Sequence, residues 1–233
     1  MSEKELTNTI AERLGTAHEK ISSAVQQANR PTDSVKLMAV SKTKPVEYIV
    51  AAYQQGQRIF GENYAQELAE KAESLNEYSD IEWHFIGPIQ SNKTAIIAKA
   101  ADWVDSVDRE KIAKRLQNHA LELNKTLNIL LQVNISNSSA KSGVLLQDVD
   151  ALAKQVDSYS QLNLRGLMAI PDQYDDNKQL IEEFEQMQAC FLRLQQQYSS
   201  VDTLSLGMSG DMQPAIQAGS TMVRLGTAIF GQR

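Results

Sequence analysis

Lys42 has the chemical setting in this sequence that most directly suggests a reaction. It follows the apolar run at residues 35–40, within Ala-Val-Ser-Lys-Thr-Lys-Pro. The run is typical of a buried strand, and Pro45 suits the first turn of a helix that follows it. A lysine at the end of a strand, with its stem removed from water, can act as a Schiff-base amine. Without elements that position it, a solvated surface charge is the better interpretation.

A second group of residues is suited to an anion. Ser209 and Gly210 precede a short helix expected at residues 213–218, and Gly226 and Thr227 follow the last apolar run. Free backbone N–H groups and hydroxyl donors at such places favour a phosphate. Turn formation alone accounts for any single glycine, but two loops with glycine and a hydroxyl residue together favour a phosphate site.

Arg224 lies near the end of the last apolar run. An arginine is costly to bury without a partner. It could face a ring nitrogen or a phosphate of a ligand, or it could form an internal salt bridge with Glu62 or Asp211. Taken alone, the sequence leaves these interpretations open.

Three more residues lie where strands are expected to end. His84 could be a general base, stack on a ring, or be hydrogen-bonded within the core, and we favour a structural role. Asn63 could bond a ligand, although asparagine is also common in turns. Met168 would form the floor of a pocket, and as an isolated residue it would be interpreted as core.

The elements that must position these residues alternate along the chain. Strict alternation of strands and helices predicts parallel strands joined by right-handed crossovers. Eight such units in 233 residues match an α/β fold of the (β/α)8 TIM-barrel type, whose active site lies at the carboxyl ends of the strands. The rival, an open doubly wound sheet, often has a glycine-rich loop after its first strand, and no glycine follows here. Strands are expected at 35–40, 58–61, 82–86, 103–107, 127–133, 162–168, 201–206 and 221–225, and helices at 45–55, 65–75, 93–100, 109–123, 148–156, 177–198 and 213–218.

A further helix is expected before the barrel. Apolar residues recur at helical spacing between residues 5 and 27, with a polar opposite face. We expect this segment, within residues 1–30, to pack on the barrel. No linker or low-complexity segment interrupts the sequence, so we expect one domain over residues 1–233.

Composition limits the function classes. The net charge of −6 argues against non-specific binding to nucleic acid or to anionic membranes. The chain has three histidines and one cysteine, so no metal site is expected, and Cys190 falls in a helical apolar pattern typical of core. No apolar run reaches about 18 residues and the N-terminus lacks an apolar signal core, so we expect a cytoplasmic protein.

Seven motifs lie between about residue 35 and the C-terminus. They are Ala-Val-Ser-Lys-Thr-Lys-Pro at 39–45, Phe-Gly-Glu-Asn at 60–63, Trp-His-Phe-Ile-Gly-Pro-Ile-Gln-Ser-Asn-Lys at 83–93, Lys-Ser-Gly at 141–143, Arg-Gly-Leu-Met-Ala-Ile at 165–170, Leu-Gly-Met-Ser at 206–209 and Val-Arg-Leu-Gly-Thr-Ala-Ile-Phe-Gly at 223–231. Together these motifs resemble the YggS/PROSC family of pyridoxal 5′-phosphate homeostasis proteins.

This resemblance implies a fold and a function. The fold is a barrel of the alanine-racemase N-terminal type that holds pyridoxal phosphate as an internal aldimine. The implied role is to buffer or deliver the cofactor, with no established catalytic reaction and with apo forms of pyridoxal phosphate-dependent enzymes as transient partners. We expect a monomer.

The resemblance also assigns site residues. Lys42 matches the aldimine lysine, and Arg224 matches the residue near the pyridine nitrogen. Gly210 stands where relatives often carry aspartate, which could alter the start of the helix on the phosphate side. The phosphate-binding loops are matched by Ser209, Gly226 and Thr227, and the positions that line the cofactor are matched by Asn63, His84 and Met168.

Racemisation is the enzymatic alternative. It requires a second acid or base on the face of the ring opposite the lysine. In the racemases that this barrel resembles, a tyrosine from a further C-terminal domain of a partner subunit supplies that group, whereas this sequence ends eight residues after Leu225. We therefore expect a cofactor-binding protein rather than an enzyme, with His84 as the one residue worth testing as a base. A barrel that binds another phosphate ligand without covalent attachment would leave Lys42 unexplained.

Overall fold

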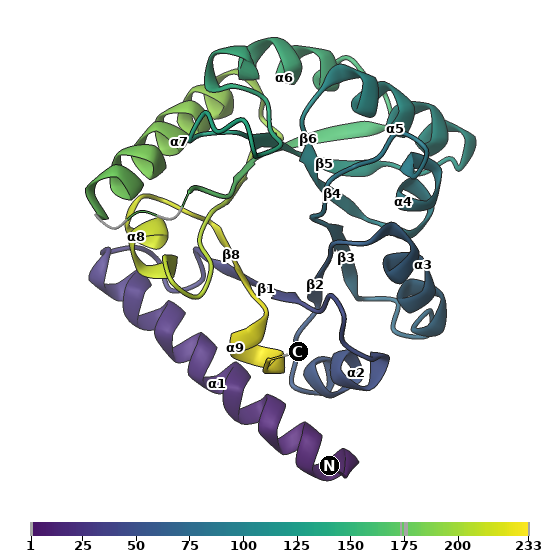
Figure 1. Ribbon diagram of the computed structural model, residues 1–233, viewed down its shortest axis with the longest axis vertical. Coiled ribbons are helices and arrows are strands. Elements are labelled where there is room, and N and C mark those ends of the chain that lie inside the picture. The colour runs from purple at the N-terminus through teal and green to yellow at the C-terminus, as the bar shows by residue number, and fades with distance from the viewer. Residues whose placement is uncertain (1, 173, 175–176, 233) are drawn as a thin grey trace.

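Eight parallel strands close into a barrel in the computed structural model, which describes residues 2–172, 174 and 177–232 (Figure 1). The strands pair in chain order, and pairing of β1 with β8 closes the ring. The predicted (β/α)8 barrel is confirmed, and the open sheet is excluded. The strands are β1 (Lys36–Val40), β2 (Ile59–Glu62), β3 (Glu82–Phe85), β4 (Trp103–Val107), β5 (Leu127–Val133), β6 (Leu162–Ala169), β7 (Thr203–Ser205) and β8 (Met222–Leu225).

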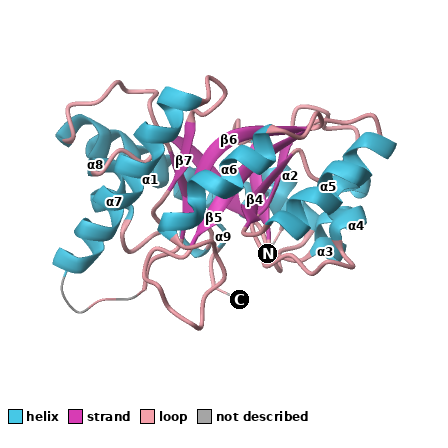
Figure 2. Cartoon of the chain, turned by 90° about the horizontal axis from the view of Figure 1, so that it is seen from above, coloured by secondary structure: helices cyan, strands magenta, loops and turns pink. Residues whose placement is uncertain are grey.

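Helices surround the strands and cover the outer face of the ring (Figure 2). One helix follows each strand, as a parallel barrel requires. They are α2 (Val46–Gln54), α3 (Ala65–Ser74), α4 (Thr94–Ala100), α5 (Glu110–Glu122), α6 (Val149–Asp157, preceded by a 3-10 turn at Leu146–Asp148), α7 (Asn177–Gln197), α8 (Met212–Gln217) and α9 (Thr227–Phe230).

Apolar side chains fill both faces of the sheet. The main core joins the outer faces of the strands to the helices. Two small clusters are separate from it, one around Met38 and Met222 and one of Trp103, Leu130 and Met168. Because side chains alternate along each strand, these two clusters fill the interior of the ring. The barrel is therefore packed through its middle and can hold a ligand only at an end.

The extra N-terminal helix, α1 (Glu3–Gln27), lies outside the ring and packs against α2, α8 and α9 (Figure 1). A capping box begins it: the Glu5 N–H donates to the Ser2 hydroxyl at 3.3 Å, and the Ser2 N–H donates to the Glu5 carboxylate at 2.7 Å. The helix expected within residues 1–30 is confirmed. A single domain over residues 1–233 stays a prediction, and its end residues 1 and 233 lie outside the described part.

The predicted element bounds differ from the structure mainly at their ends. The run at 127–133 coincides with β5, whereas β7 covers only the middle of the run at 201–206. Pro45 is the N-cap of α2, one residue before the first turn in which we placed it. The short helix α9 was not predicted.

Three properties of the described residues bear on function. None of their helices has the length and apolar character needed to span a bilayer. They contain no group of three or more His, Cys, Asp or Glu side chains that could hold a metal ion. Cys190 is buried in α7, as its helical pattern predicts, and burial raises the pKa of its thiol.

Candidate functional site

The carboxyl ends of the strands surround a cavity of about 330 Å³. Eight of the nine predicted site residues line it, and His84 is the exception. The ionisable side chains among the described lining residues are Lys42 and Arg224, and none of them carries a carboxylate. The cavity therefore favours an anionic ligand. Its lining consists of Val40, Lys42, Asn63, Ile86, Met168, Ile170, Met208, Ser209, Gly210, Arg224, Gly226 and Thr227.

Lys42 lies in a tight turn directly after β1, where it is half-buried. The Lys44 N–H donates to the carbonyl oxygen of Ser41 at 3.0 Å, so Lys42 and Thr43 are the two central residues of the turn. The Ser41 N–H donates to the carbonyl oxygen of Gly61 at 3.0 Å, which ties the turn to β2. The turn thus holds the lysine at the mouth of the barrel, as its sequence position predicts.

Arg224 reaches the cavity from β8 and is 4% exposed. Its Nη1 donates to the carbonyl oxygen (2.8 Å) and hydroxyl (2.7 Å) of Ser205, and its Nη2 donates to the carbonyl oxygen of Ala169 (2.9 Å). Burial lowers the pKa of Arg224, while the carboxylates of Asp105 and Asp211 act in the opposite sense.

These contacts test the salt bridges that the sequence suggested for Arg224. Neither suggested salt bridge forms, because Glu62 pairs with Lys71 and no ion pair joins Arg224 to Asp211 among the described residues. Three of the five guanidinium N–H groups bond protein oxygens. A contact of the guanidinium with a ligand stays a prediction.

The loop after β7 presents Ser209 and Gly210 to the cavity. It is closed by two hydrogen bonds, in which the Met208 N–H donates to the Asp211 carboxylate (2.6 Å) and the Asp211 N–H donates to the carbonyl oxygen of Met208 (3.3 Å). Ser209 and Gly210 between them are exposed. A cradle of this kind offers backbone N–H groups and one hydroxyl to an anion.

The turn between β8 and α9 provides the second predicted loop. A Cβ on Gly226 would stand 3.2 Å from the carbonyl oxygen of Val40, which is tight enough to push the turn away from β1. Glycine therefore allows the two strand ends to approach one another. Thr227 begins α9, is exposed and lines the cavity.

Asn63 and Met168 also line the cavity. The Asn63 Oδ1 atom is buried and has no hydrogen-bond partner among the described residues. The backbone of Asn63 is held closely by Gly87, where a Cβ would stand 2.0 Å from the Asn63 carbonyl oxygen. Met168 is fully buried on β6, one residue before that strand ends. A buried oxygen without a partner is unfavourable, and it points to a donor that a ligand would bring.

His84 lies deeper than the lining residues. It is fully buried, its Nδ1 is 3.0 Å from the Asp105 carboxylate, and its ring stacks on Trp103 at 4.9 Å. Ile86, two residues later on the same face, lines the cavity instead. The structural role favoured from the sequence agrees with these contacts, and a contact of His84 with a cofactor stays a prediction.

Four apolar lining residues were missed: Val40, Ile86, Ile170 and Met208. Each ends one of the predicted strands or lies within two residues of its end, which is the signal by which the polar lining residues were found. They were not singled out, because an apolar side chain near a strand end does not by itself distinguish a pocket wall from packing.

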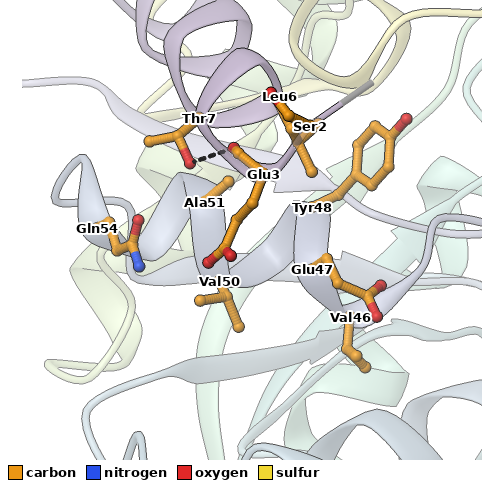
Figure 3. A pocket seen from close by; sticks show the side chains of 10 residues that line it. All are labelled: Ser2, Glu3, Leu6, Thr7, Val46, Glu47, Tyr48, Val50, Ala51 and Gln54. Carbon is orange, nitrogen blue, oxygen red and sulfur yellow. Dashed lines mark hydrogen bonds between the residues drawn. The ribbon is translucent and has the colours of Figure 1, made fainter.

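A larger cavity of about 530 Å³ lies away from the barrel mouth, between the start of α1 and α2 (Figure 3). The Thr7 hydroxyl donates to the carbonyl oxygen of Glu3 within α1, and the carboxylates of Glu3 and Glu47 lie at its wall. The described lining residues include no lysine, arginine or histidine. This cavity lacks converging reactive groups, so we place the functional site at the barrel mouth.

Comparison with known proteins decides the family. The profile of the alanine racemase N-terminal domain matches residues 13–233. A pyridoxal phosphate homeostasis protein of Pasteurella multocida is 51% identical over 97% of this chain and 98% of its own length. The protein of the same name in Escherichia coli K12 is 47% identical over 97% of both chains. The chain belongs to the family of pyridoxal phosphate homeostasis proteins.

Solved structures place this homeostasis-family chain among related barrels. PipY of Synechococcus elongatus, solved with PLP bound, is 35% identical and superposes with a TM-score of 0.81 over 95% of this chain and 100% of its own. An alanine racemase of Clostridium difficile superposes with a TM-score of 0.70 over 93% of this chain and 56% of its own, at 11% identity. At that identity the racemase shares the fold alone.

Proposed function

We propose that this chain binds pyridoxal 5′-phosphate at the mouth of the barrel and takes part in pyridoxal phosphate homeostasis. One observation carries the proposal: Lys42, Arg224 and two loops with hydroxyl and glycine residues line a single cavity that has no carboxylate among its described lining residues. An aldehyde that carries a phosphate needs an amine and an anion-binding cradle within one molecule's length. The name of the relatives and the PLP-bound PipY structure support the same ligand.

The residues present fit this cofactor group by group. Lys42 offers a primary amine to the aldehyde, and the loops at 209–210 and 226–227 offer N–H and hydroxyl donors to the phosphate. The Oδ1 atom of Asn63, which has no partner in the described part of the chain, suits the ring hydroxyl, which is a donor. The remaining N–H groups of Arg224 suit an acceptor such as the ring nitrogen.

Bound pyridoxal phosphate supplies an aldehyde that condenses reversibly with a neutral primary amine, with loss of one water molecule. We propose Lys42 as that amine. The apolar side chains of Val40 and Ile86 in the same lining limit the water around it. The guanidinium of Arg224 and the two loops would hold the anionic ligand in place beside the Lys42 amine.

We propose that the chain holds and releases the cofactor rather than catalysing a reaction with it. Racemisation needs a second acid or base, and the described lining residues offer only Lys42 and Arg224 as ionisable groups. The one observation that favours a racemase is the buried His84–Asp105 pair, whose His84 Nε2 has no partner among the described residues. Turnover of L- or D-alanine that disappears in His84→Ala would support that second candidate.

Covalent attachment, the cellular setting and the partners belong to the same proposal. The chain would act in the cytoplasm as a monomer and pass pyridoxal phosphate to apo forms of enzymes that depend on it. Its net charge of −6 disfavours nucleic acid and anionic membranes as partners. Release to an apo-enzyme requires that the bond at Lys42 be reversible.

Titration with pyridoxal phosphate, followed by visible absorption, tests the proposal. The wild-type chain should take up one equivalent and develop an absorption band that free cofactor lacks. Lys42→Ala should lose the band, while Lys36→Ala, at an exposed position on the preceding strand β1, should keep it. A wild-type chain that stays colourless after dialysis against pyridoxal phosphate contradicts the proposal.

A further inference from the structure

A buried ionic cluster lies directly behind the turn that carries Lys42. It consists of Glu62 at the end of β2 and of Lys71 and Glu67 on α3, and we call it the Glu62–Lys71–Glu67 cluster. The Lys71 Nζ lies 2.7 Å from the Glu62 carboxylate and 2.7 Å from the Glu67 carboxylate. Glu62 is fully buried and Lys71 is 5% exposed. None of the three lines the cavity.

The cluster bonds the chain on both sides of Lys42. Before the lysine, the Ser41 hydroxyl donates to the Glu62 carboxylate (2.6 Å), and the Lys71 ammonium donates to the carbonyl oxygen of Ser41 (2.8 Å). After it, the Thr43 N–H donates to the Glu67 carboxylate (2.5 Å). Three hydrogen bonds to charged groups therefore hold the two neighbours of a single residue.

The turn needs such support because its backbone is strained. Thr43 has a φ of +63°, in the left-handed region that a β-branched residue rarely adopts. It occupies the third position of the turn, where glycine is usual when φ is positive. Strain of this kind persists only where surrounding contacts over-determine the conformation. The Thr43 amide bonded to Glu67 is the contact that fixes it here.

Stability alone is a weak explanation for the cluster. Buried ion pairs often contribute no more than apolar packing of the same volume. Two carboxylates also share one ammonium, and the Glu62 Oε2 atom is buried without a partner among the described residues. Burial raises the pKa of Glu62, and the ammonium of Lys71 only partly opposes this. The cluster also makes three hydrogen bonds to Ser41 and Thr43, and these bonds fix the backbone of the turn at the mouth of the barrel.

We propose that Glu67, Lys71 and Glu62 are positioning residues for Lys42, which hold its turn so that the amine faces the aldehyde of the bound cofactor. The inference rests on the proposed binding of pyridoxal phosphate. It deepens that function, because the cluster controls how fast and how tightly the covalent bond forms without touching the cofactor.

Glu67→Ala tests the proposal, because Glu67 is the cluster member nearest the surface, with 22% of its side chain exposed. The variant loses the bond to Thr43 and one bond to Lys71. Two ligands distinguish a loss of Lys42 positioning from a general loss of cofactor binding. Pyridoxal phosphate reports the covalent step, measured as the rate and the extent of borohydride-trapped adduct. Pyridoxine 5′-phosphate, which carries an alcohol in place of the aldehyde, reports binding to the pocket alone.

We expect Glu67→Ala to slow adduct formation and weaken pyridoxal phosphate retention by about tenfold or more, with unchanged affinity for pyridoxine phosphate. Glu67→Gln keeps an acceptor for the Thr43 N–H and should recover most of the rate. Glu73→Ala, at an exposed position on the same helix, is the matched control. Equal losses with both probes, or a normal rate in Glu67→Ala, would overturn the proposal.

Thr43→Gly provides a second, independent variant. Glycine accepts the left-handed conformation without strain, so the turn should depend less on Glu67. The loss of rate caused by Glu67→Ala should therefore be smaller in the Thr43→Gly background than in the wild type. Equal losses of rate in both backgrounds would contradict the positioning role of Glu67. A wild-type chain that forms no adduct would instead contradict the proposed function, so the two failures are distinguishable.

Discussion

Replacement of Arg224 by methionine tests whether this buried cation supports both the barrel and the cofactor. Methionine has a similar reach and no charge. Arg224 is 4% exposed and its guanidinium donates to two oxygens of Ser205 and one of Ala169, so the variant leaves these acceptors without their donors. It also removes a positive charge near the fully buried Asp105 carboxylate.

The expected change in the free energy of unfolding of Arg224→Met is the balance of opposing contributions. A buried polar group left without a partner costs about 1–3 kcal/mol, and removing one member of a buried charged group costs about 3–5 kcal/mol. Burying the guanidinium itself costs several kcal/mol, which methionine recovers. We expect the free energy of unfolding to fall by about 3 kcal/mol. Loss of a charged donor in the cavity should weaken binding of pyridoxine phosphate by about 10- to 100-fold.

Urea unfolding and equilibrium binding of pyridoxine phosphate measure the two effects separately. Arg224→Lys keeps the charge, but its compact ammonium cannot span Ser205 and Ala169 as the guanidinium does, so intermediate values are expected. Arg193→Met, which breaks an exposed pair with Asp150, is the matched control and should cost less than about 1 kcal/mol. An Arg224→Met chain with wild-type stability and affinity would refute the account of this residue.

Two further predictions concern the phosphate loops and the buried carboxyl of Glu62. Ser209→Ala and Thr227→Ala should each weaken pyridoxal phosphate by about tenfold and leave the affinity for pyridoxal, which has no phosphate, unchanged; equal losses for both ligands would contradict a phosphate contact. Because burial raises the pKa of Glu62 in the folded chain, the folded state binds that proton more tightly than the unfolded state does. The stability that this proton adds is complete below the ordinary value of 4.5 and is lost as the pH rises through the raised folded pKa. Urea unfolding at a series of pH values measures the free energy of unfolding of the wild type and of Glu62→Gln. The wild-type value minus the variant value should fall as the pH rises through this window. A difference that does not change with pH would contradict the raised pKa of Glu62.

The sequence predicts the barrel well because its signal is local and repeated. The run at 127–133 coincides with β5, since five of its seven residues are apolar and the polar residues Thr126 and Asn134 flank it. The helix α9 escaped prediction because four residues are too few for a helical period. The short β7 was overestimated because apolar residues continue beyond its paired part.

The site is predictable only in part, because some of its contacts depend on how the strands and helices pack together. Lys42, Ser209 and Thr227 could be placed at the mouth because strand ends converge in a barrel. The bonds of Arg224 to Ser205 and Ala169 could not, because the choice of partner depends on the register of three strands. The contact of Lys71 with Glu62 likewise depends on how α3 lies against β2, which no spacing in the sequence specifies.

The most direct test of the central claim is to locate the covalent bond. Wild-type chain loaded with pyridoxal phosphate is reduced with borohydride, digested, and analysed by mass spectrometry of its peptides. We predict that the pyridoxyl group is found on Lys42, and that Lys42→Ala carries no modified lysine above the level of the unloaded chain. Modification of another lysine instead, with Lys42 unmodified in the wild type, would contradict the account.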